Sequence, residues 1–219
     1  MGQYYTALAI DGENKVKKLK PYEFDSFNKL WEHAWIGNKF VNAVYSLLHD
    51  RPCKIAWIGD YSDNPYDPNA DAYAKALAHE EFMRMYKIAW GKAEPLKSSN
   101  FTRKQLKLVN HATKRGYLVN HDLKCSLDMA AYIRRSTKAN GQCFNPLPLL
   151  TACGNSRGNG DYEGQSCYED VGTWAFHRLE YTDRIPEGYS EKEYRFIEER
   201  DTCTVFLSVN LDEKMKHKN

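Results

Sequence analysis

The spacing of hydrophobic and polar positions in the N-terminal part of the chain predicts a hairpin, a broken helix and a buried strand. Residues 4–10 have the composition of a strand, and Asp11-Gly12 is typical of a hairpin turn into the basic strand 15–20. Apolar positions recur at helical spacing over 26–49, with a break or kink expected at Gly37-Asn38. The short apolar run 53–61 indicates an interior strand that ends at a Gly-Asp pair.

Two helices are predicted in the middle of the chain. An amphipathic helix over 71–90 ends at Gly91, and a second helix over 103–115 ends before Gly116. Thr102 and Gln105 form a capping box at the start of the second helix. On a helical wheel its apolar side lies opposite a basic face, which consists of Arg103, Lys107, His111 and Lys114.

The remainder of the chain reads as strands separated by a long loop. Residues 116–121 and 125–129 are predicted to form a hairpin, and 130–135 either extend it or turn helical. The glycine-rich stretch 136–172 is expected to be a long loop region. Strands are predicted over 174–181 and 202–211, with an acidic segment and a turn at 186–188 between them.

This order of elements predicts an α+β fold. We expect a mainly antiparallel sheet with three or four helices in a single compact domain over 1–213. The basic residues 214–219 are expected to be a frayed tail. No internal repeat or linker divides the chain.

Composition narrows the class of protein. The chain has 219 residues, of which 42% are hydrophobic and 13% aromatic, and this excludes disorder over most of its length. No apolar run approaches the ~18 residues of a membrane-spanning helix, and residues 1–10 lack the layout of a signal peptide. We therefore expect a soluble cytoplasmic protein without a membrane partner.

The six cysteines do not form a recognisable metal or redox motif. No two of them stand in a CxxC pair, so a zinc cluster is not expected. An even number could form three bridges in a secreted protein, but without an export signal free thiols are favoured. We expect small core hydrophobes at Cys53, Cys125, Cys143, Cys153, Cys167 and Cys203.

A net charge of +2 conceals a strong separation of charge along the chain. Residues 84–115 contain nine basic side chains and one acid, whereas residues 158–201 contain twelve acids and five bases. A local potential of this size attracts charged partners whatever the overall charge.

The basic helix is the best-supported candidate for binding. Its cations lie opposite its apolar side, and Trp90, Phe101 and Tyr117 flank it as candidate stacking platforms. Such a face binds nucleic acid or an acidic protein surface, but a solvated surface helix has the same pattern. The candidate ligand-binding residues here are Arg103, Lys104, Lys107, His111 and Lys114.

A glycine-rich loop over 154–162 is the second candidate. Its backbone amides could converge on an anion, and Arg157 could add a bidentate phosphate contact. It matches neither a P-loop nor a dinucleotide fingerprint, so a structural loop or a partner-binding loop remain alternatives and no cofactor is assigned. The candidate residues are Asn155, Arg157, Gly158 and Gly160.

Catalytic chemistry has weaker support. Asp60 and Asp161 each occur in the tripeptide Gly-Asp-Tyr. The two could form a carboxylate pair for a divalent metal or for acid–base catalysis. The alternative is that both are turn residues that bind nearby backbone. Four histidines could join as ligand or base, although none has a metal-binding spacing; they are His33, His111, His121 and His177.

Four short sequence motifs make the chain resemble known sequences. They are MGQYY at the start, WEHAWIGN from Trp31, WIGDY from Trp57 and LPLLTACGNSRGNGDY from Leu147. In these motifs the chain resembles a family of proteins that are encoded by bacteria and their phages and have no assigned function. The resemblance implies a phage or mobile-element origin, where accessory proteins that bind or block host factors are common. Cys153 and Ser156 depart from the acidic and glycine residues usual in that family.

Together these observations favour a non-catalytic accessory protein that binds an anionic partner: nucleic acid, a nucleotide or an acidic protein site. One alternative is an inhibitor of a host protein whose aromatic surface includes Trp31, Trp35 and Tyr66. The other is a metal-assisted phosphoester or nucleotide hydrolase that uses Asp60 and Asp161.

Overall fold

The computed structural model describes most of the chain up to residue 194 and three short strands after it. The described residues are 3–60, 62, 79–91, 95–153, 170–194, 196–199, 203–206 and 209–210, and side chains are described within 3–62, 84–91 and 95–194 only.

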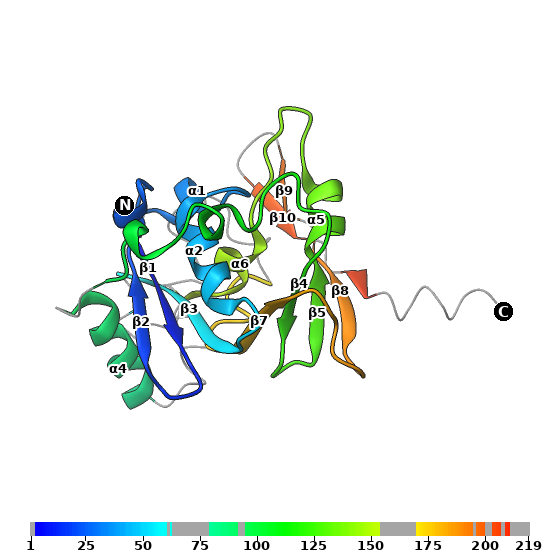
Figure 1. The fold of residues 1–219 in the computed structure, drawn as a ribbon. Helices are drawn as coiled ribbons and strands as arrows, with labels where there is room; N and C mark the ends of the chain where they lie inside the picture. The colour runs from blue at the N-terminus through cyan, green and yellow to red at the C-terminus, as the bar shows by residue number, and fades with distance from the viewer. Residues whose placement is uncertain are drawn as a thin grey trace.

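A nine-stranded sheet organises the fold (Figure 1). Eight strands follow one another in the order β11-β8-β5-β4-β7-β3-β1-β2, and the ninth, β6, pairs with β3. Most pairs are antiparallel; β3 with β6 and β5 with β8 are parallel. The strands are β1 (Tyr5–Ile10), β2 (Val16–Leu19), β3 (Cys53–Gly59), β4 (Tyr117–Asn120), β5 (Cys125–Asp128), β6 (Ala152–Cys153), β7 (Arg178–Thr182), β8 (Ser190–Glu193) and β11 (Val209–Asn210). A separate hairpin joins β9 (Phe196–Glu199) to β10 (Cys203–Phe206).

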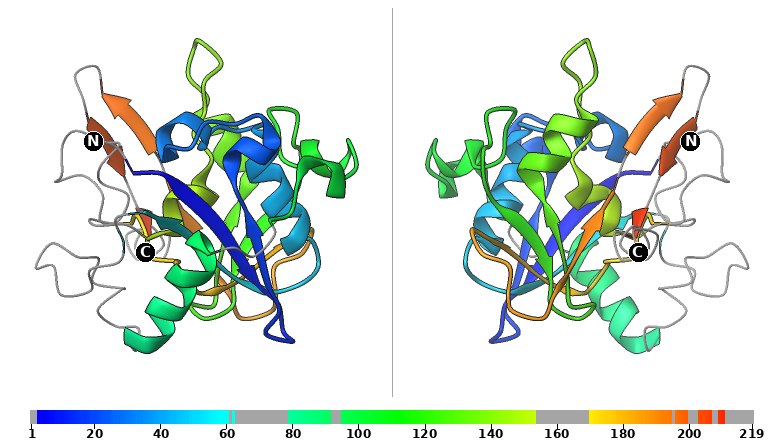
Figure 2. Two further views of the ribbon diagram at one scale, coloured as in Figure 1. Left: turned by 90° about the vertical axis from the view of Figure 1, so that its left-hand side faces the viewer. Right: turned by 90° about the vertical axis from the view of Figure 1, so that its right-hand side faces the viewer.

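Helices cover the two faces of the sheet unequally. The described residues include five α-helices: α1 (Leu30–His33), α2 (Lys39–Leu48), α4 (His79–Trp90), α5 (Met129–Ser136) and α6 (Pro146–Leu150). Three short 3₁₀ turns accompany them: η1 (Pro21–Phe24), η2 (Ser98–Asn100) and η3 (Gln105–Lys107). The sheet lies between α2 on one side and α4 on the other, as the two side views show (Figure 2).

The alternation of side chains along β1 explains this layering. Successive side chains of a strand point to opposite faces of a sheet. Ala7 and Ala9 belong to the larger core beneath α2 and α6, whereas Leu8 and Ile10 pack with Met85 of α4. All six residues of β1 are buried, because both faces of the strand are covered.

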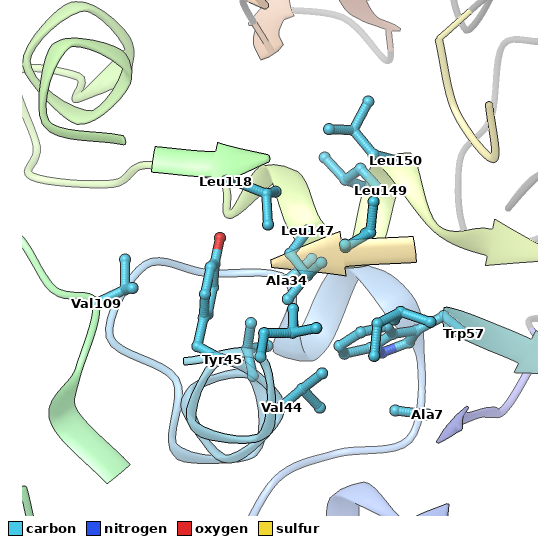
Figure 3. Close-up of a cluster of buried hydrophobic side chains, with 14 of the residues drawn as sticks. Ala7, Ala34, Val44, Tyr45, Trp57, Val109, Leu118, Leu147, Leu149 and Leu150 are labelled. Atoms are coloured by element: carbon cyan, nitrogen blue, oxygen red, sulfur yellow. The ribbon is translucent and has the colours of Figure 1, made fainter. Parts of the chain in front are cut away.

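The larger core joins segments that are far apart in the sequence. Val44 and Tyr45 of α2 meet Trp57 of β3, Leu118 of β4 and the apolar residues of α6 (Figure 3). Val109 reaches the same cluster from the long connection between α4 and β4. That connection is therefore part of the core.

The predicted α+β class with a mostly antiparallel sheet is confirmed, but the sheet is larger than expected and the helices outnumber the expected three or four. The N-terminal hairpin, the interior strand β3 and the hairpin of β4 and β5 are confirmed. The break at Gly37-Asn38 is also confirmed, and the Asn38 side chain caps α2 by accepting a hydrogen bond from the amide of Phe40 at 2.9 Å.

The loop predicted over 136–172 is confirmed for 137–145 but is wrong for 146–153. Residues 146–150 form α6, whose five residues are all buried, and β6 follows directly. Proline fits the first turn of a helix, where an amide hydrogen has no partner within the helix. Asn145 caps this turn by accepting from the amide of Leu147 at 3.0 Å.

Three further predictions need correction. The strand predicted over 174–181 begins only at Arg178, because the amide of Trp174 bonds to the carbonyl of Leu150 at 2.8 Å in a turn. The acidic segment contains two strands, β8 and β9, which the sequence pattern did not predict. The strand predicted over 202–211 is split into β10 and β11, which pair with different partners.

Two further predictions concern the state of the cysteines and the absence of a membrane-spanning helix. The side chains of four cysteines are described, and all four are buried free thiols: Cys53, Cys125, Cys143 and Cys153. Burial raises the pKa of Cys125 and of Cys143 to about 11, so both thiols stay protonated at neutral pH. No helix among the described residues is long and apolar enough to cross a membrane.

His33 is a fully buried histidine of the core. Its Nε2 lies 3.1 Å from Trp57 Nε1, and its Nδ1 lies 3.0 Å from the carbonyl oxygen of Phe27. Because an indole nitrogen only donates, Nε2 must accept and the proton must sit on Nδ1. Burial lowers the pKa of His33 to about 4, because the charged form loses its hydration in the core, and the hydrogen bond to the carbonyl of Phe27 opposes this shift only in part.

His33 therefore makes the protein sensitive to acid. In the unfolded chain the histidine protonates near its ordinary pKa of about 6.5, whereas in the folded protein it stays neutral down to about 4. The free energy of unfolding should fall by about 3 kcal/mol as the pH drops through this window. Urea unfolding at a series of pH values measures this loss.

The matched variant is His33→Gln, whose side-chain oxygen can still accept from Trp57 and which does not titrate. Its stability should be lower at neutral pH but should lack this acid-dependent loss. An equally steep loss in both proteins between pH 6.5 and 4 would show that other groups cause it.

Candidate functional site

The strongest concentration of exposed charge among the described residues lies in the connection between α4 and β4. We call residues 97–115 the basic segment. It contains six lysine or arginine residues and no acid, and all six are exposed: Lys97, Arg103, Lys104, Lys107, Lys114 and Arg115. The segment passes over α2 and projects from the body of the molecule (Figure 2).

The helix predicted over 103–115 is wrong, although its start signal is real. Thr102 and Gln105 form the capping interactions, with the amide of Thr102 bonded to Gln105 Oε1 at 2.8 Å. The amide of Gln105 bonds in turn to Thr102 Oγ1 at 3.2 Å. Only the single 3₁₀ turn η3 follows, and no α-helix forms after it, although Leu108 still has helical dihedral angles.

Asn42 on α2 explains why the helix stops. Its Oδ1 accepts from the amide of Val109 at 2.6 Å, and its Nδ2 donates to the carbonyl of Val109 at 3.0 Å. In an α-helix the amide of Val109 would instead bond to the carbonyl of Gln105. The two hydrogen bonds from Asn42 thus replace helix continuation with a link between the segment and α2.

Asn110 supports the same departure from the helix. Its Nδ2 donates to the carbonyl of Lys107 at 2.7 Å, and its Oδ1 accepts from the amide of Ala112 at 2.8 Å. Asparagine side chains commonly compete for helical backbone groups in this way. The backbone around 107–112 is consequently held by side chains.

Apolar contacts fix the inner side of the segment. Val109 is fully buried, while Leu106 and Leu108 are partly buried and pack against the core. The ring of Phe101 lies 5.8 Å from that of Phe24 in η1. The segment is therefore an anchored structure with an apolar inner side and a basic outer side.

The cations of this outer side are not neutralised within the described structure. Arg103, Lys104, Lys107 and Lys114 make no ion pair with any described residue, and His111 is exposed beside them. The single helical face predicted for Arg103, Lys107, His111 and Lys114 does not exist, because the helix is absent, but all four side chains face solvent.

The acidic C-terminal part of the chain finds its partners elsewhere. Glu193 pairs with Arg135 of α5, and Glu180 pairs with His121 at 2.9 Å. Asp122 belongs to the turn between β4 and β5 and pairs with Arg178 at 3.2 Å. These described carboxylates leave the basic segment free to attract an outside anion.

The second candidate site cannot be assembled from the described residues. Asn155, Arg157, Gly158, Gly160 and Asp161 lie outside them. The phosphate-cradle interpretation of the glycine-rich loop and the pairing of Asp60 with Asp161 stay predictions.

Asp60 itself acts in the described structure as a residue that binds backbone. Its Oδ1 accepts from the amide of Tyr4 at 3.0 Å, and its own amide bonds to the carbonyl of Tyr4 at 3.0 Å. No group of three or more histidine, cysteine or acidic side chains within the described part of the chain could hold a metal ion. The described residues therefore do not supply the metal site that the hydrolase alternative requires.

The aromatic residues of the inhibitor alternative pack mainly on one another. Trp31 and Trp35 are partly buried, and the ring of Trp35 stacks on Phe144 with centroids 4.3 Å apart. The ring of Trp31 lies 4.6 Å from the same phenylalanine. Tyr66 lies outside the described residues. This cluster supports the core, and its role as an interface stays a prediction.

The sequence pattern did not predict the cluster formed by His121, Glu180 and Tyr189. His121 at the end of β4 contacts Glu180 Oε2 through Nε2 at 2.9 Å and the Tyr189 hydroxyl through Nδ1 at 3.1 Å. These contacts attach the 183–189 connection to the turn of the β4–β5 hairpin. Both ring nitrogens are thereby engaged, so the cluster is arranged as a structural link. Only the predicted hairpin turn gave a signal for it.

Comparison of the chain with models of protein families, with curated proteins and with solved structures found no match. The assignment of the site therefore depends on the geometry described above.

The structure predicts that Asn42 is needed to hold the basic segment in place. Asn42→Ala leaves the buried amide and carbonyl of Val109 without partners, which should lower the free energy of unfolding by about 2–4 kcal/mol. Urea unfolding measures the loss, and hydrogen exchange followed by mass spectrometry should show faster exchange over 102–112.

Asn110→Ala is the matched control, because it removes the same carboxamide from a site where water can replace its bonds. Its cost should be about 1 kcal/mol or less. Equal losses in the two variants would contradict a special role for Asn42.

Proposed function

We propose that this protein is a non-catalytic binding protein whose basic segment engages an anionic partner. The observation that carries the proposal is the set of six exposed cations in 97–115, with no acid among them and no ion pair to a described residue. Nothing else in the described structure combines so much like charge with an anchored backbone.

The clustered cations attract an anion, and they also lower the stability of the folded segment. Like charges held close together repel, and this self-repulsion destabilises the folded segment. An outside polyanion removes the repulsion and gains from the release of its own counterions. Because the apolar side and Asn42 already fix the backbone, little ordering entropy is lost when the partner binds.

The candidate contact residues are the exposed cations of the segment and the neighbouring histidine: Arg103, Lys104, Lys107, His111 and Lys114. The glycine-rich loop, with Asn155, Arg157, Gly158 and Gly160, is proposed as a second contact on the strength of its sequence alone. A phage-type accessory role agrees with the family resemblance and belongs to the same proposal.

Charge reversal within the segment tests the proposal directly. Arg103→Glu with Lys107→Glu should weaken binding to a fluorescein-labelled DNA oligonucleotide about 100-fold or more, because two contacts are lost and two repulsions are added. The slope of log affinity against log salt should become shallower by about 2. Fluorescence anisotropy over a salt series measures both quantities, and labelled polyglutamate serves as the protein-like polyanion.

The control is Lys54→Glu with Lys124→Glu, which changes the net charge equally. Both lysines are exposed and lie outside the basic segment: Lys54 is in β3, in register with Ile10 of β1, and Lys124 is in the turn between β4 and β5. This variant should retain most of the affinity. If both double variants lose affinity equally, attraction depends on overall charge and the proposed site is wrong; if neither polyanion binds the wild-type protein, the proposed function is wrong.

A further inference from the structure

Tyr22 is an exposed aromatic residue of η1, the 3₁₀ turn that contacts the basic segment through Phe24. It lies in η1, where 55% of its surface is exposed. The Nζ of Lys20 lies 5.7 Å from the centroid of its ring. A lysine over one side of an aromatic ring is held there by the quadrupole of the ring, which leaves the other side for a flat ligand.

Three contacts attach η1 and the preceding strand β2 to the start of the basic segment. The rings of Phe24 and Phe101 lie 5.8 Å apart, and Leu19 forms a β-bridge with Leu96. The amide of Leu96 bonds to the carbonyl of Lys18 at 2.7 Å. Figure 1 shows η1 and η2 side by side at the same corner of the molecule.

This arrangement places η1, the turn that carries Tyr22, against the start of the basic segment. Arg103, the first arginine of the segment, is two residues along the chain from Phe101, whose ring contacts Phe24 of η1. The carboxylate of Asp25, at the end of η1, is paired with Lys39 at 3.2 Å. Lys39 offsets part of this charge, and Glu23 of η1 adds a second carboxylate next to Tyr22.

We infer that the anionic partner is a single-stranded nucleic acid and that one of its unpaired bases stacks on Tyr22. This inference rests on the proposed function and names its ligand class and a further contact residue. Proteins that bind single strands combine a cationic track for the phosphates with aromatic rings for the bases. The basic segment supplies the first of these and Tyr22 the second.

The exposed ring is what favours a single strand over the other polyanions. In a duplex the faces of the bases are covered by their neighbours, so a tyrosine on the protein surface has no base to stack on. An acidic protein would be attracted by the same cations but would gain little from the ring. Only an unpaired base offers a flat face directly beside a phosphate.

Substitution of Tyr22 tests the inference with two probes of equal length. Tyr22→Ala should weaken binding of a labelled oligonucleotide of about twenty unpaired thymidines by about 5- to 150-fold, which corresponds to about 1–3 kcal/mol for one stacked base. Binding of a duplex of about the same length should not change. Tyr22→Phe, which keeps the ring, should bind both probes as the wild-type protein does.

Tyr4→Ala is the matched control. Tyr4 is similarly exposed, at 50%, but the carboxylate of Asp60 binds its amide, so its surroundings are acidic. This variant should bind the unpaired oligonucleotide as the wild-type protein does. Because both tyrosines are exposed, neither substitution should alter the urea midpoint by more than a small amount.

The outcomes separate this inference from the proposed function. If Arg103→Glu with Lys107→Glu abolishes binding but Tyr22→Ala does not change it, the stacking inference is wrong and the binding proposal stands. An equal loss for duplex and single strand in Tyr22→Ala, or stronger binding of labelled polyglutamate than of either oligonucleotide, also overturns the inference. If no polyanion binds, both fail.

Discussion

The hydrogen bonds between the Asn42 carboxamide and the backbone of Val109 decide the shape of the candidate site. Asn42 belongs to a helix whose other inward residues are apolar, and it is itself almost fully buried. A buried carboxamide is stable only when its donors and acceptor have partners, and Asn42 finds them in Val109 and in the carbonyl of Asn38. The rest of the basic segment follows from this link, because a backbone fixed at one interior point must turn its polar residues outward.

The sheet provides the rigid support for that link. Both faces of β1 and β3 are covered, and on one face these strands and α2 share a packed core. The basic segment is attached to this core by Val109, and η1 is attached through Phe24. A charged surface built in this way keeps its geometry without a partner, which is the condition for binding without a large entropic cost.

Much of the fold could be predicted from local sequence patterns, whereas the shape of the site could not. The hairpin 4–20 and the helix break at Gly37-Asn38 depend on turn and capping residues within a few positions, so the sequence reveals them. The helix predicted over 103–115 failed because the signals at Thr102 and Gly116 are local, while the competing bond comes from Asn42, far away in the sequence. The sequence shows where the basic residues lie along the chain. The attachment of their backbone to the core and the exposure of their side chains depend on tertiary contacts.

The basic segment and the acidic C-terminal part of the chain stay separated in the structure. Two described acids of the C-terminal part pair with residues outside the basic segment, Glu180 with His121 and Glu193 with Arg135. A protein selected for stability alone would pair its opposite charges or disperse like ones, since clustered cations repel. Local rules of this kind are commonly broken where a function requires it, and other contacts then offset the cost. Here the offset is identifiable as the apolar inner side of the segment together with Asn42, and the proposed binding of an anion requires such an offset.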